Sequence, residues 1–153
     1  MAVEVGQRAP DFELRNAHGQ PVRLSSLRGA KNVVLMFYPL AFSGVCSGEM
    51  SALRDNFPEA TRDDVALLTV SVDSTYAHRV WADRENFSFE LLSDFWPHGE
   101  VARLYGVFDE ATGLAERGTF IIDKTGVVRW KTVSPIRQAR DIAAYQKALA
   151  ALG

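Results

Sequence analysis

The sequence predicts an α/β fold in which a central mixed β-sheet is flanked by helices. Two continuous apolar runs, residues 32–38 and 65–72, are each followed by apolar residues at helical spacing. Runs of this kind are typical of parallel strands that are buried on both faces of a sheet. A later run, residues 118–133, is interrupted at residues 123–126 and predicts an antiparallel hairpin. The sheet is therefore expected to contain both parallel and antiparallel pairs.

The N-terminal half of the chain begins with a predicted β-hairpin. In DFELRNAHGQPVRL, residues 11–24, apolar residues alternate on either side of a turn that contains Gly19. NVVLMFY, residues 32–38, is the first central strand, and residues 39–44 must form a loop. A helix follows and ends at Pro58, and its inner face is defined by four positions at helical spacing: Cys46, Met50, Leu53 and Phe57.

The second half continues the alternation of strands and helices. VALLTVSV, residues 65–72, should lie parallel to the first central strand because a helix connects the two. A helix near residues 75–87 comes next, then a short strand at residues 90–94 and a short helix at residues 99–105. The C-terminal segment, residues 137–153, has the pattern of an amphipathic helix. The expected inward residues of the two longer helices are Ala77, Val80, Trp81, Phe87, Ile142, Tyr145 and Leu149.

This order of elements is that of a thioredoxin-like α/β sandwich with an N-terminal β-hairpin. The chain has no linker, internal repeat or low-complexity segment, so we expect residues 1–153 to form a single domain. Folds of this kind serve many functions. The function must therefore be sought in a site and not in the fold.

Charge and composition exclude several classes of function. The chain of 153 residues has a net charge of −2 and no cluster of Lys and Arg, so neither nucleic acid nor an anionic membrane is an expected partner. No run of about 18 apolar residues could span a membrane. The start MAVEVGQRAPDFEL lacks the basic and apolar regions of a secretory signal, so we expect a cytoplasmic protein.

The single cysteine, Cys46, is the strongest candidate for chemistry. A lone cysteine forms no intramolecular disulfide, which suits a reducing compartment. A helix that starts at Ser43 or Gly44 places Cys46 in its first turn, where unpaired backbone N–H groups and the helix dipole favour a thiolate. The alternative is a non-enzymatic binding domain in which Cys46 packs as a small hydrophobe and its thiol is chemically inert.

The residues around Cys46 resemble the active-site loop of peroxiredoxins. Pro39, Ser43 and Cys46 form the pattern P-x-x-x-S-x-x-C. Four further segments extend the resemblance over the whole chain: APDFEL, VVLMFYPLAF, LLSDFWPHG and RGTFIID. Together they are most similar to the one-cysteine AhpE group of actinobacterial peroxiredoxins. The resemblance implies an antioxidant thiol peroxidase, for which we expect no cofactor.

The resemblance also implies roles for four residues. Cys46 would be the peroxidatic cysteine, whose thiolate attacks a peroxide and becomes a sulfenic acid. Arg117 would lie beside the thiolate and hold a peroxide oxygen, a task suited to a permanently charged, rigid donor. Ser43, where the family more often has Thr, would offer its hydroxyl, and Pro39 would shield the pocket. Without the resemblance, Arg117 is an ordinary surface residue, Ser43 a plain helix cap and Pro39 the end of a strand.

The lone cysteine also determines what the protein needs from outside. A sulfenic acid without an internal partner must be reduced by an external thiol or a small redoxin, and the resemblance suggests mycothiol with mycoredoxin. The expected substrates are hydrogen peroxide, organic hydroperoxides and peroxynitrite, and Leu40, Phe42 and Val45 are apolar neighbours that would admit organic hydroperoxides. We predict a homodimer. The segment PLAF, with Tyr38 and Phe42, should either join the dimer contact, as in relatives, or lie in the core.

Two other chemistries fit the sequence poorly. A thioredoxin-type disulfide exchanger would need a second cysteine at the position of Glu49. Glu49 itself matches an acidic position of the family, but a carboxylate near a helix N-terminus often only complements the dipole, so it is left outside the site. A metal site is not expected, because the histidines are scattered without paired ligand spacing. We expect His18 to lie in a turn, His78 on a helix surface and His98 in a loop. The three tryptophans, Trp81, Trp96 and Trp130, are expected to be packing residues.

Overall fold

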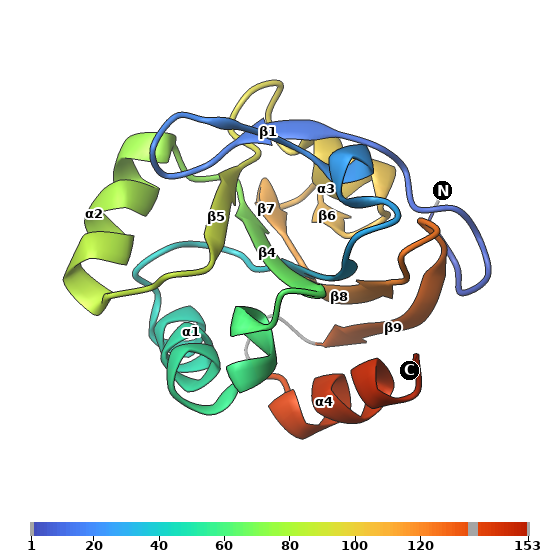
Figure 1. Cartoon of the computed structure of the whole chain (residues 1–153). Helices are drawn as coiled ribbons and strands as arrows, with labels where there is room; N and C mark the ends of the chain where they lie inside the picture. The colour runs from blue at the N-terminus through green and yellow to red at the C-terminus, as the bar shows by residue number, and fades with distance from the viewer. Residues whose placement is uncertain (1, 135–137, 153) are drawn as a thin grey trace.

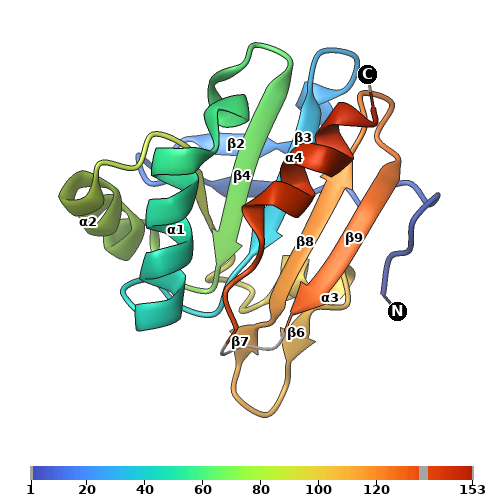
Figure 2. The same ribbon diagram turned by 90° about the horizontal axis from the view of Figure 1, so that it is seen from below.

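The computed structural model describes residues 2–134 and 138–152. Among these residues, seven strands form one mixed sheet in the order β2-β1-β5-β4-β3-β8-β9. Helices cover both of its faces: α1, α2 and α4 lie on one face, and α3 lies on the other (Figures 1 and 2). The predicted arrangement of a mixed sheet between two helical layers is confirmed.

The two central strands are the two apolar runs of the sequence. β3 (Asn32–Phe37) is buried along its whole length and pairs in parallel with β4 (Val65–Ser71). β5 (Glu90–Ser93) adds a second parallel pair beside β4. On the other side of β3, β8 (Arg117–Ile122) runs antiparallel and continues into β9 (Val128–Ser134), which is the predicted C-terminal hairpin. The carboxyl end of β3 therefore lies next to the start of β8.

The N-terminal hairpin is shorter than the alternation of apolar residues suggests. β1 (Glu13–Arg15) and β2 (Pro21–Arg23) pair antiparallel, and β1 joins the sheet beside β5. Short elements without a clear sequence pattern were not predicted, because two to four residues carry too little periodicity. They are the 3-10 turn at Pro58–Thr61 and a separate two-stranded ribbon of β6 (Phe108–Asp109) and β7 (Leu114–Ala115). A further 3-10 turn spans Leu24–Leu27.

The helices follow the predicted order. α1 (Gly44–Asn56) starts where the sequence indicated, and its expected inner residues Cys46, Met50 and Leu53 are at most 1% exposed. α3 (Glu100–Leu104) is the predicted short helix. The C-terminal helix, α4 (Ile142–Ala150), buries Tyr145 and Leu149 as expected, with Ile142 half-buried against the same core.

The inner face of α2 (Thr75–Glu85) differs from the prediction. His78, expected on the helix surface, is fully buried together with Trp81, whereas Val80 is 53% exposed. Residues 78 and 81 are three apart and share one face of the helix, so that Val80 points outward. The prediction is therefore wrong for Val80 and His78, whereas Trp81 and Phe87 are buried as expected.

The tryptophans also divide differently from the prediction. Trp81 is buried and Trp130 packs edge-on against Tyr145, with 5.7 Å between the ring centroids. Trp96 is 83% exposed, because it projects from the turn that closes where Gly99 donates a hydrogen bond to the carbonyl of Asp94. The prediction that Trp96 is a packing residue is wrong.

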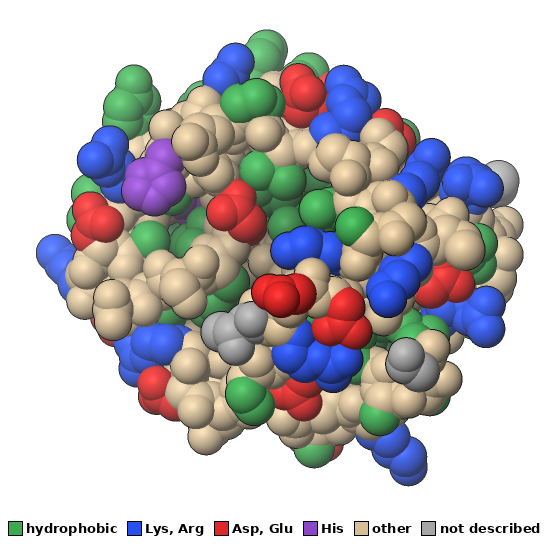
Figure 3. Space-filling model, in the orientation of Figure 1, with side chains coloured by type: hydrophobic (Ala, Val, Ile, Leu, Met, Phe, Trp, Pro, Cys, Tyr) green, Lys and Arg blue, Asp and Glu red, His purple; other side chains and the backbone are tan. Residues whose placement is uncertain are grey.

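The face of the molecule drawn in Figure 3 has no single dominant sign of charge. In Figure 3, basic and acidic side chains alternate over the described residues of that face. This distribution agrees with the small net charge of −2. It provides no broad positive field of the kind that attracts polyanions.

Candidate active site

Cys46 lies in the first turn of α1, directly after the loop that leaves β3. Ser43 is the N-cap residue of this helix, and its carbonyl accepts the first helical hydrogen bond from the N–H of Ser47 at 2.8 Å. The N–H groups that precede Ser47 in the first turn, including that of Cys46, have no acceptor within the helix. They favour a negative charge at this end of the helix. The side chain of Cys46 is fully buried.

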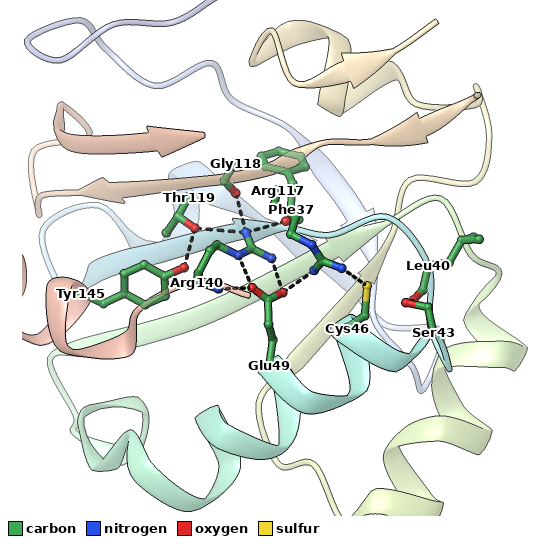
Figure 4. A network of polar contacts seen from close by, with 10 residues as sticks. All are labelled: Phe37, Leu40, Ser43, Cys46, Glu49, Arg117, Gly118, Thr119, Arg140 and Tyr145. Atoms are coloured by element: carbon green, nitrogen blue, oxygen red, sulfur yellow. Dashed lines mark hydrogen bonds and ion pairs between the residues drawn. The ribbon is translucent and has the colours of Figure 1, made fainter. Parts of the chain in front are cut away.

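Arg117, the first residue of β8, reaches the sulfur from the neighbouring strand. Its Nη2 donates a hydrogen bond to Cys46 Sγ at 3.1 Å (Figure 4). Because β8 is antiparallel to β3, the start of β8 lies at the end of β3 where the loop to Cys46 begins. Arg117 is only 2% exposed, so the alternative of an ordinary surface arginine is wrong.

Glu49, which lies one turn after Cys46, binds the same guanidinium. Arg117 Nη1 donates to Glu49 Oε1, and both side chains are 2% exposed. The carboxylate also accepts three hydrogen bonds from Arg140: from the backbone N–H at 2.7 Å, from Nε at 2.8 Å and from Nη2 at 2.9 Å. Buried charges need such partners, and Glu49 therefore does more than complement the helix dipole.

Arg140 connects this cluster to the sheet. Its Nη1 donates to the carbonyl oxygens of Phe37 at 2.7 Å and Gly118 at 3.2 Å, and to Thr119 Oγ1 at 3.1 Å. Thr119 Oγ1 in turn lies 2.8 Å from the hydroxyl of Tyr145, whose pKa burial raises to about 12. The network joins α1, β3, β8 and α4 (Figure 4). The carboxylate that binds the site arginine is thus held in a fixed frame.

A pocket of about 250 Å³ opens beside Arg117. Two of the expected apolar neighbours, Leu40 and Val45, line it, whereas Phe42 packs against Trp81 with 5.8 Å between the ring centroids. The thiol of Cys46 is not exposed. Arg117 connects it to the pocket, because Arg117 both lines the pocket and donates a hydrogen bond to the sulfur. The lining residues are Pro39, Leu40, Ser43, Gly44, Val45, Leu114 and Arg117.

Ser43 and Pro39 both border this pocket. The hydroxyl of Ser43 donates to the carbonyl of Leu40 at 3.0 Å and makes no cap bond to the helix backbone. Ser43 occupies the N-cap position, but the alternative that its side chain caps the helix by bonding the backbone N–H of Cys46 is wrong. Its oxygen can still accept a further hydrogen bond, since a hydroxyl has two lone pairs. Pro39 is buried and forms part of the wall.

Comparison with known proteins identifies the family. The model of the AhpC/TSA family matches residues 5–131, which is most of the chain. The chain belongs to the AhpC/TSA family. Alkyl hydroperoxide reductase E of Mycobacterium tuberculosis is 49% identical over 150 residues, which cover 98% of this chain and 98% of that protein. The selenocysteine-containing peroxiredoxin PrxU of Peptoclostridium acidaminophilum is 38% identical over 151 residues, which cover 92% of this chain and 73% of that protein.

Solved structures of the family agree with this assignment. The crystal structure of Enterococcus faecalis AhpC has a TM-score of 0.88 at 28% identity and covers 99% of this chain and 92% of its own. Peroxidoxin BcpB from Mycobacterium tuberculosis has a TM-score of 0.81 at 34% identity and covers 97% of this chain and 96% of its own. With its single cysteine, this AhpC/TSA member is a one-cysteine peroxiredoxin of the alkyl hydroperoxide reductase E type, a thiol-dependent peroxidase. The thioredoxin-like fold predicted from the sequence is confirmed.

Sequence reasoning missed or set aside three residues of this candidate site. Glu49 carried a usable signal, because a charged residue stood beside Met50 on the apolar face of a predicted helix. Arg140 and Leu114 carried none. Arg140 stands alone before Asp141, the N-cap residue of α4, and Leu114 belongs to a strand of two residues. Only the folded chain brings them to the site.

The histidines do not gather around the site or around each other. His18 lies in the turn between β1 and β2, and His98 Nε2 is 2.7 Å from the carbonyl oxygen of Gly113 in a loop contact. Across residues 2–134 and 138–152, no three His, Cys, Asp or Glu side chains form a group that could hold a metal ion. Within the same ranges, no helix is long and apolar enough to cross a membrane.

Proposed function

We propose that Cys46 is the peroxidatic residue of this peroxiredoxin and that Arg117, Ser43 and Pro39 complete its site, within one domain of residues 1–153. The observation that carries the proposal is the hydrogen bond of 3.1 Å from Arg117 Nη2 to Cys46 Sγ in the interior of the protein. A cysteine that only fills the core needs no cationic partner, and burying a guanidinium costs free energy unless it is paired.

The proposed reaction is a displacement on the O–O bond. The thiolate of Cys46 attacks the terminal oxygen of a hydroperoxide, an S–O bond forms and the O–O bond breaks. The transferred oxygen keeps its proton, so that Cys46 becomes a sulfenic acid, and hydroxide or alkoxide leaves and takes a proton from water. The sulfur is oxidised and the peroxide is reduced, without any cofactor.

Arg117 has the geometry to stabilise this transition state. A guanidinium has five N–H donors in a rigid plane, so the same group that binds Sγ can also bind a peroxide oxygen as negative charge develops on it. Ser43 would accept the peroxide O–H, because its own proton is engaged by Leu40. Pro39 would limit access of water to the sulfur. Positioning of this kind supplies most of the rate enhancement in such displacements.

We infer that the substrates are hydrogen peroxide, organic hydroperoxides and peroxynitrite. The apolar side chains of Leu40, Val45 and Leu114 in the pocket support the organic class, since each buried CH₂ contributes about 0.8 kcal/mol. The name of the similar alkyl hydroperoxide reductase E refers to this class in that protein. Rate constants measured with hydrogen peroxide and with a long-chain hydroperoxide would rank the two, and the long-chain compound should react faster.

The reductant must come from outside the chain, because Cys46 is the only cysteine. A thiol attacks the sulfenic acid, water leaves and a mixed disulfide forms, which a second thiol then reduces. We propose mycothiol with mycoredoxin as this donor, in the cytoplasm, where thiols are kept reduced. Mass spectrometry of the oxidised protein incubated with mycothiol should detect the mixed disulfide at Cys46; persistence of the sulfenic acid would contradict this donor.

A homodimer is proposed through the exposed apolar side chains near the pocket. Leu40 and Phe42 are 38% and 45% exposed, and α2 adds Tyr76 and Val80 at 82% and 53%. Tyr38 is fully buried, so for this residue the core alternative holds. Light scattering at micromolar concentration should give the mass of a dimer, and Tyr76→Asp should lower it. A monomer mass for the wild-type protein would exclude the dimer.

The experiment that tests the proposed function is stopped-flow oxidation of the reduced protein by hydrogen peroxide. Trp81 lies in the same core cluster as Cys46, so tryptophan fluorescence should report the reaction, and mass spectrometry locates the added oxygen. We expect rapid stoichiometric oxidation of Cys46, lost in Arg117→Ala. A rate equal to that of free cysteine would mean that Cys46 is structural.

A further inference from the structure

The loop between β3 and Cys46 forms much of the pocket wall but has few backbone bonds of its own. It contributes Pro39, Leu40 and Ser43 to the lining. Phe42, which lies in this loop between Leu40 and Ser43, has a φ of 69°, a left-handed conformation that residues with a side chain rarely adopt. Strained residues of this kind persist only where the surrounding structure holds them in place. The contacts that hold this loop therefore determine the shape of the site.

One such contact comes from Asp73, which follows β4. Asp73 Oδ2 accepts a hydrogen bond from the backbone N–H of Ala41 at 2.8 Å, next to the strained Phe42. The same oxygen accepts the hydroxyl proton of Ser71 at 2.6 Å. A charged acceptor bonded to a backbone N–H forms one of the stronger hydrogen bonds in proteins. Asp73 makes no hydrogen bond to Cys46. Its contact with the site is the hydrogen bond to the loop at Ala41.

His78 on α2 orients the Asp73 carboxylate through Ser71. Its Nε2 lies 2.7 Å from Ser71 Oγ and 3.2 Å from the hydroxyl of Tyr38, the residue before Pro39. Because Ser71 gives its single proton to Asp73, His78 Nε2 must be the donor to Ser71. The ring then carries its proton on Nε2, and its buried Nδ1 is without a hydrogen-bond partner. Burial lowers the pKa of His78 to about 4, which keeps this tautomer neutral.

We propose that Asp73 is a positioning residue for the reaction at Cys46: its carboxylate holds the pocket loop through Ala41, and the buried Ser71–His78 pair orients that carboxylate. The network touches the loop at two points, at the Tyr38 hydroxyl before Pro39 and at the Ala41 N–H. The inference rests on the proposed peroxidase function of Cys46. It adds a second frame to the site, separate from the carboxylate and arginine network around Glu49.

The test compares two substitutions of Asp73 with a matched control. Asp73→Ala removes the acceptor, whereas Asp73→Asn keeps an amide oxygen that can accept from Ala41 and Ser71. The control is Asp123→Ala: this side chain is 17% exposed against 15% for Asp73, and its Oδ1 accepts a backbone N–H of Thr125 at 2.9 Å and a hydroxyl at 2.6 Å, in the turn after β8.

Three quantities are measured on each variant: the rate constant for oxidation by hydrogen peroxide, the thiolate absorbance as a function of pH, and hydrogen–deuterium exchange of the backbone amides of residues 40–43. We expect Asp73→Ala to react about 10-fold more slowly, because misplaced groups lose catalysis steeply, with an unchanged pH dependence of the thiolate. Exchange in the loop should be faster. Asp73→Asn should stay within about twofold of the wild-type rate. Asp123→Ala should keep the wild-type rate and loop exchange.

The outcomes separate this inference from the proposed function. Wild-type oxidation no faster than that of free cysteine overturns the function, and exchange in the loop still reports whether Asp73 holds Ala41. Fast wild-type oxidation with an unchanged rate in Asp73→Ala overturns the inference, as does an equal loss in Asp123→Ala. If Asp73→Ala does not fold, Ser71→Ala is used in its place, because it leaves the carboxylate without its orienting partner; a wild-type rate in that variant also overturns the inference.

Discussion

Glu49 accepts a hydrogen bond from Arg117 in the interior of the protein, and this contact fixes the guanidinium that binds the sulfur of Cys46. Both partners are 2% exposed, and Arg140 supplies a second guanidinium to the same carboxylate. The site therefore contains two buried cations and one buried anion beside the thiol. Removal of the anion should affect both stability and reactivity.

Glu49→Gln is expected to lower the free energy of unfolding by on the order of 3 kcal/mol, because two buried guanidinium groups lose their charged partner. Urea unfolding at neutral pH measures this change. The control is Glu110→Gln: Glu110 is 70% exposed and accepts a hydrogen bond from Arg103 Nε at 2.8 Å, so its substitution should leave the free energy of unfolding close to that of the wild type. Equal losses in the two variants would show that burial of the pair is energetically unimportant.

Arg117→Lys is expected to slow oxidation by roughly 100-fold although the charge is kept. A lysine ammonium is a single point of charge on a flexible stem and cannot bind Sγ, Glu49 and a peroxide oxygen in one plane. Stopped-flow oxidation by hydrogen peroxide measures the rate. Arg103→Lys, at the exposed pair with Glu110, should react as the wild type does. A wild-type rate in Arg117→Lys would mean that charge alone is sufficient.

Ser43→Ala should lower the oxidation rate about 10-fold, while Ser43→Thr should equal or exceed the wild type, because threonine keeps the hydroxyl and restricts its rotamer. Stability should change by less than about 1 kcal/mol in Ser43→Ala, since this serine makes no helix-cap bond. In Ser74→Ala the cap bond from Ala77 N–H at 3.2 Å is lost, and about 1 kcal/mol should be lost with it. A full rate in Ser43→Ala would remove the hydroxyl from the site.

His78 should make the protein less stable in mild acid. Burial lowers its pKa to about 4 from the ordinary value of 6.5, so between these pH values the unfolded chain binds a proton that the folded protein does not. The free energy of unfolding must then fall as the pH is lowered through this window. Between pH 7 and pH 5, we expect the wild type to lose about 2 kcal/mol more than His78→Gln in urea unfolding. Parallel losses would exclude a neutral His78 in the folded protein.

Gly48→Ala should separate the two halves of the catalytic cycle. Cys46 is fully buried, so we expect an external thiol to reach its sulfur only when the start of α1 opens. A Cβ at Gly48 would meet no atom within 4 Å, and alanine stabilises a helix by roughly 0.5–1 kcal/mol relative to glycine. Reduction of the sulfenic acid should slow about 2- to 5-fold with oxidation unchanged. Equal rates of reduction would indicate that α1 does not need to open.

Much of the fold could be predicted because it depends on local patterns. β3 and β4 are runs in which every residue faces a core, and such runs are visible without knowledge of their neighbours. The inner face of α1 is equally local. At α2 the pattern placed Val80 in the core and His78 on the surface. It was wrong there because the hydroxyls of Ser71 and Tyr38, which bond the buried His78 ring, lie on other elements.

The sequence by itself determined the candidate for the chemical centre: one cysteine, at the start of a helix after a buried strand, in a motif that resembles the peroxiredoxin loop. Tertiary structure alone decided what surrounds it. Arg117 is 71 positions from Cys46, and Arg140 is 91 positions from Glu49, so strand pairing and helix packing had to bring them together. A lone arginine has no periodicity that marks it as buried. Its partner is defined only in the folded protein, where the cost of burying its charge is met by a carboxylate from another element.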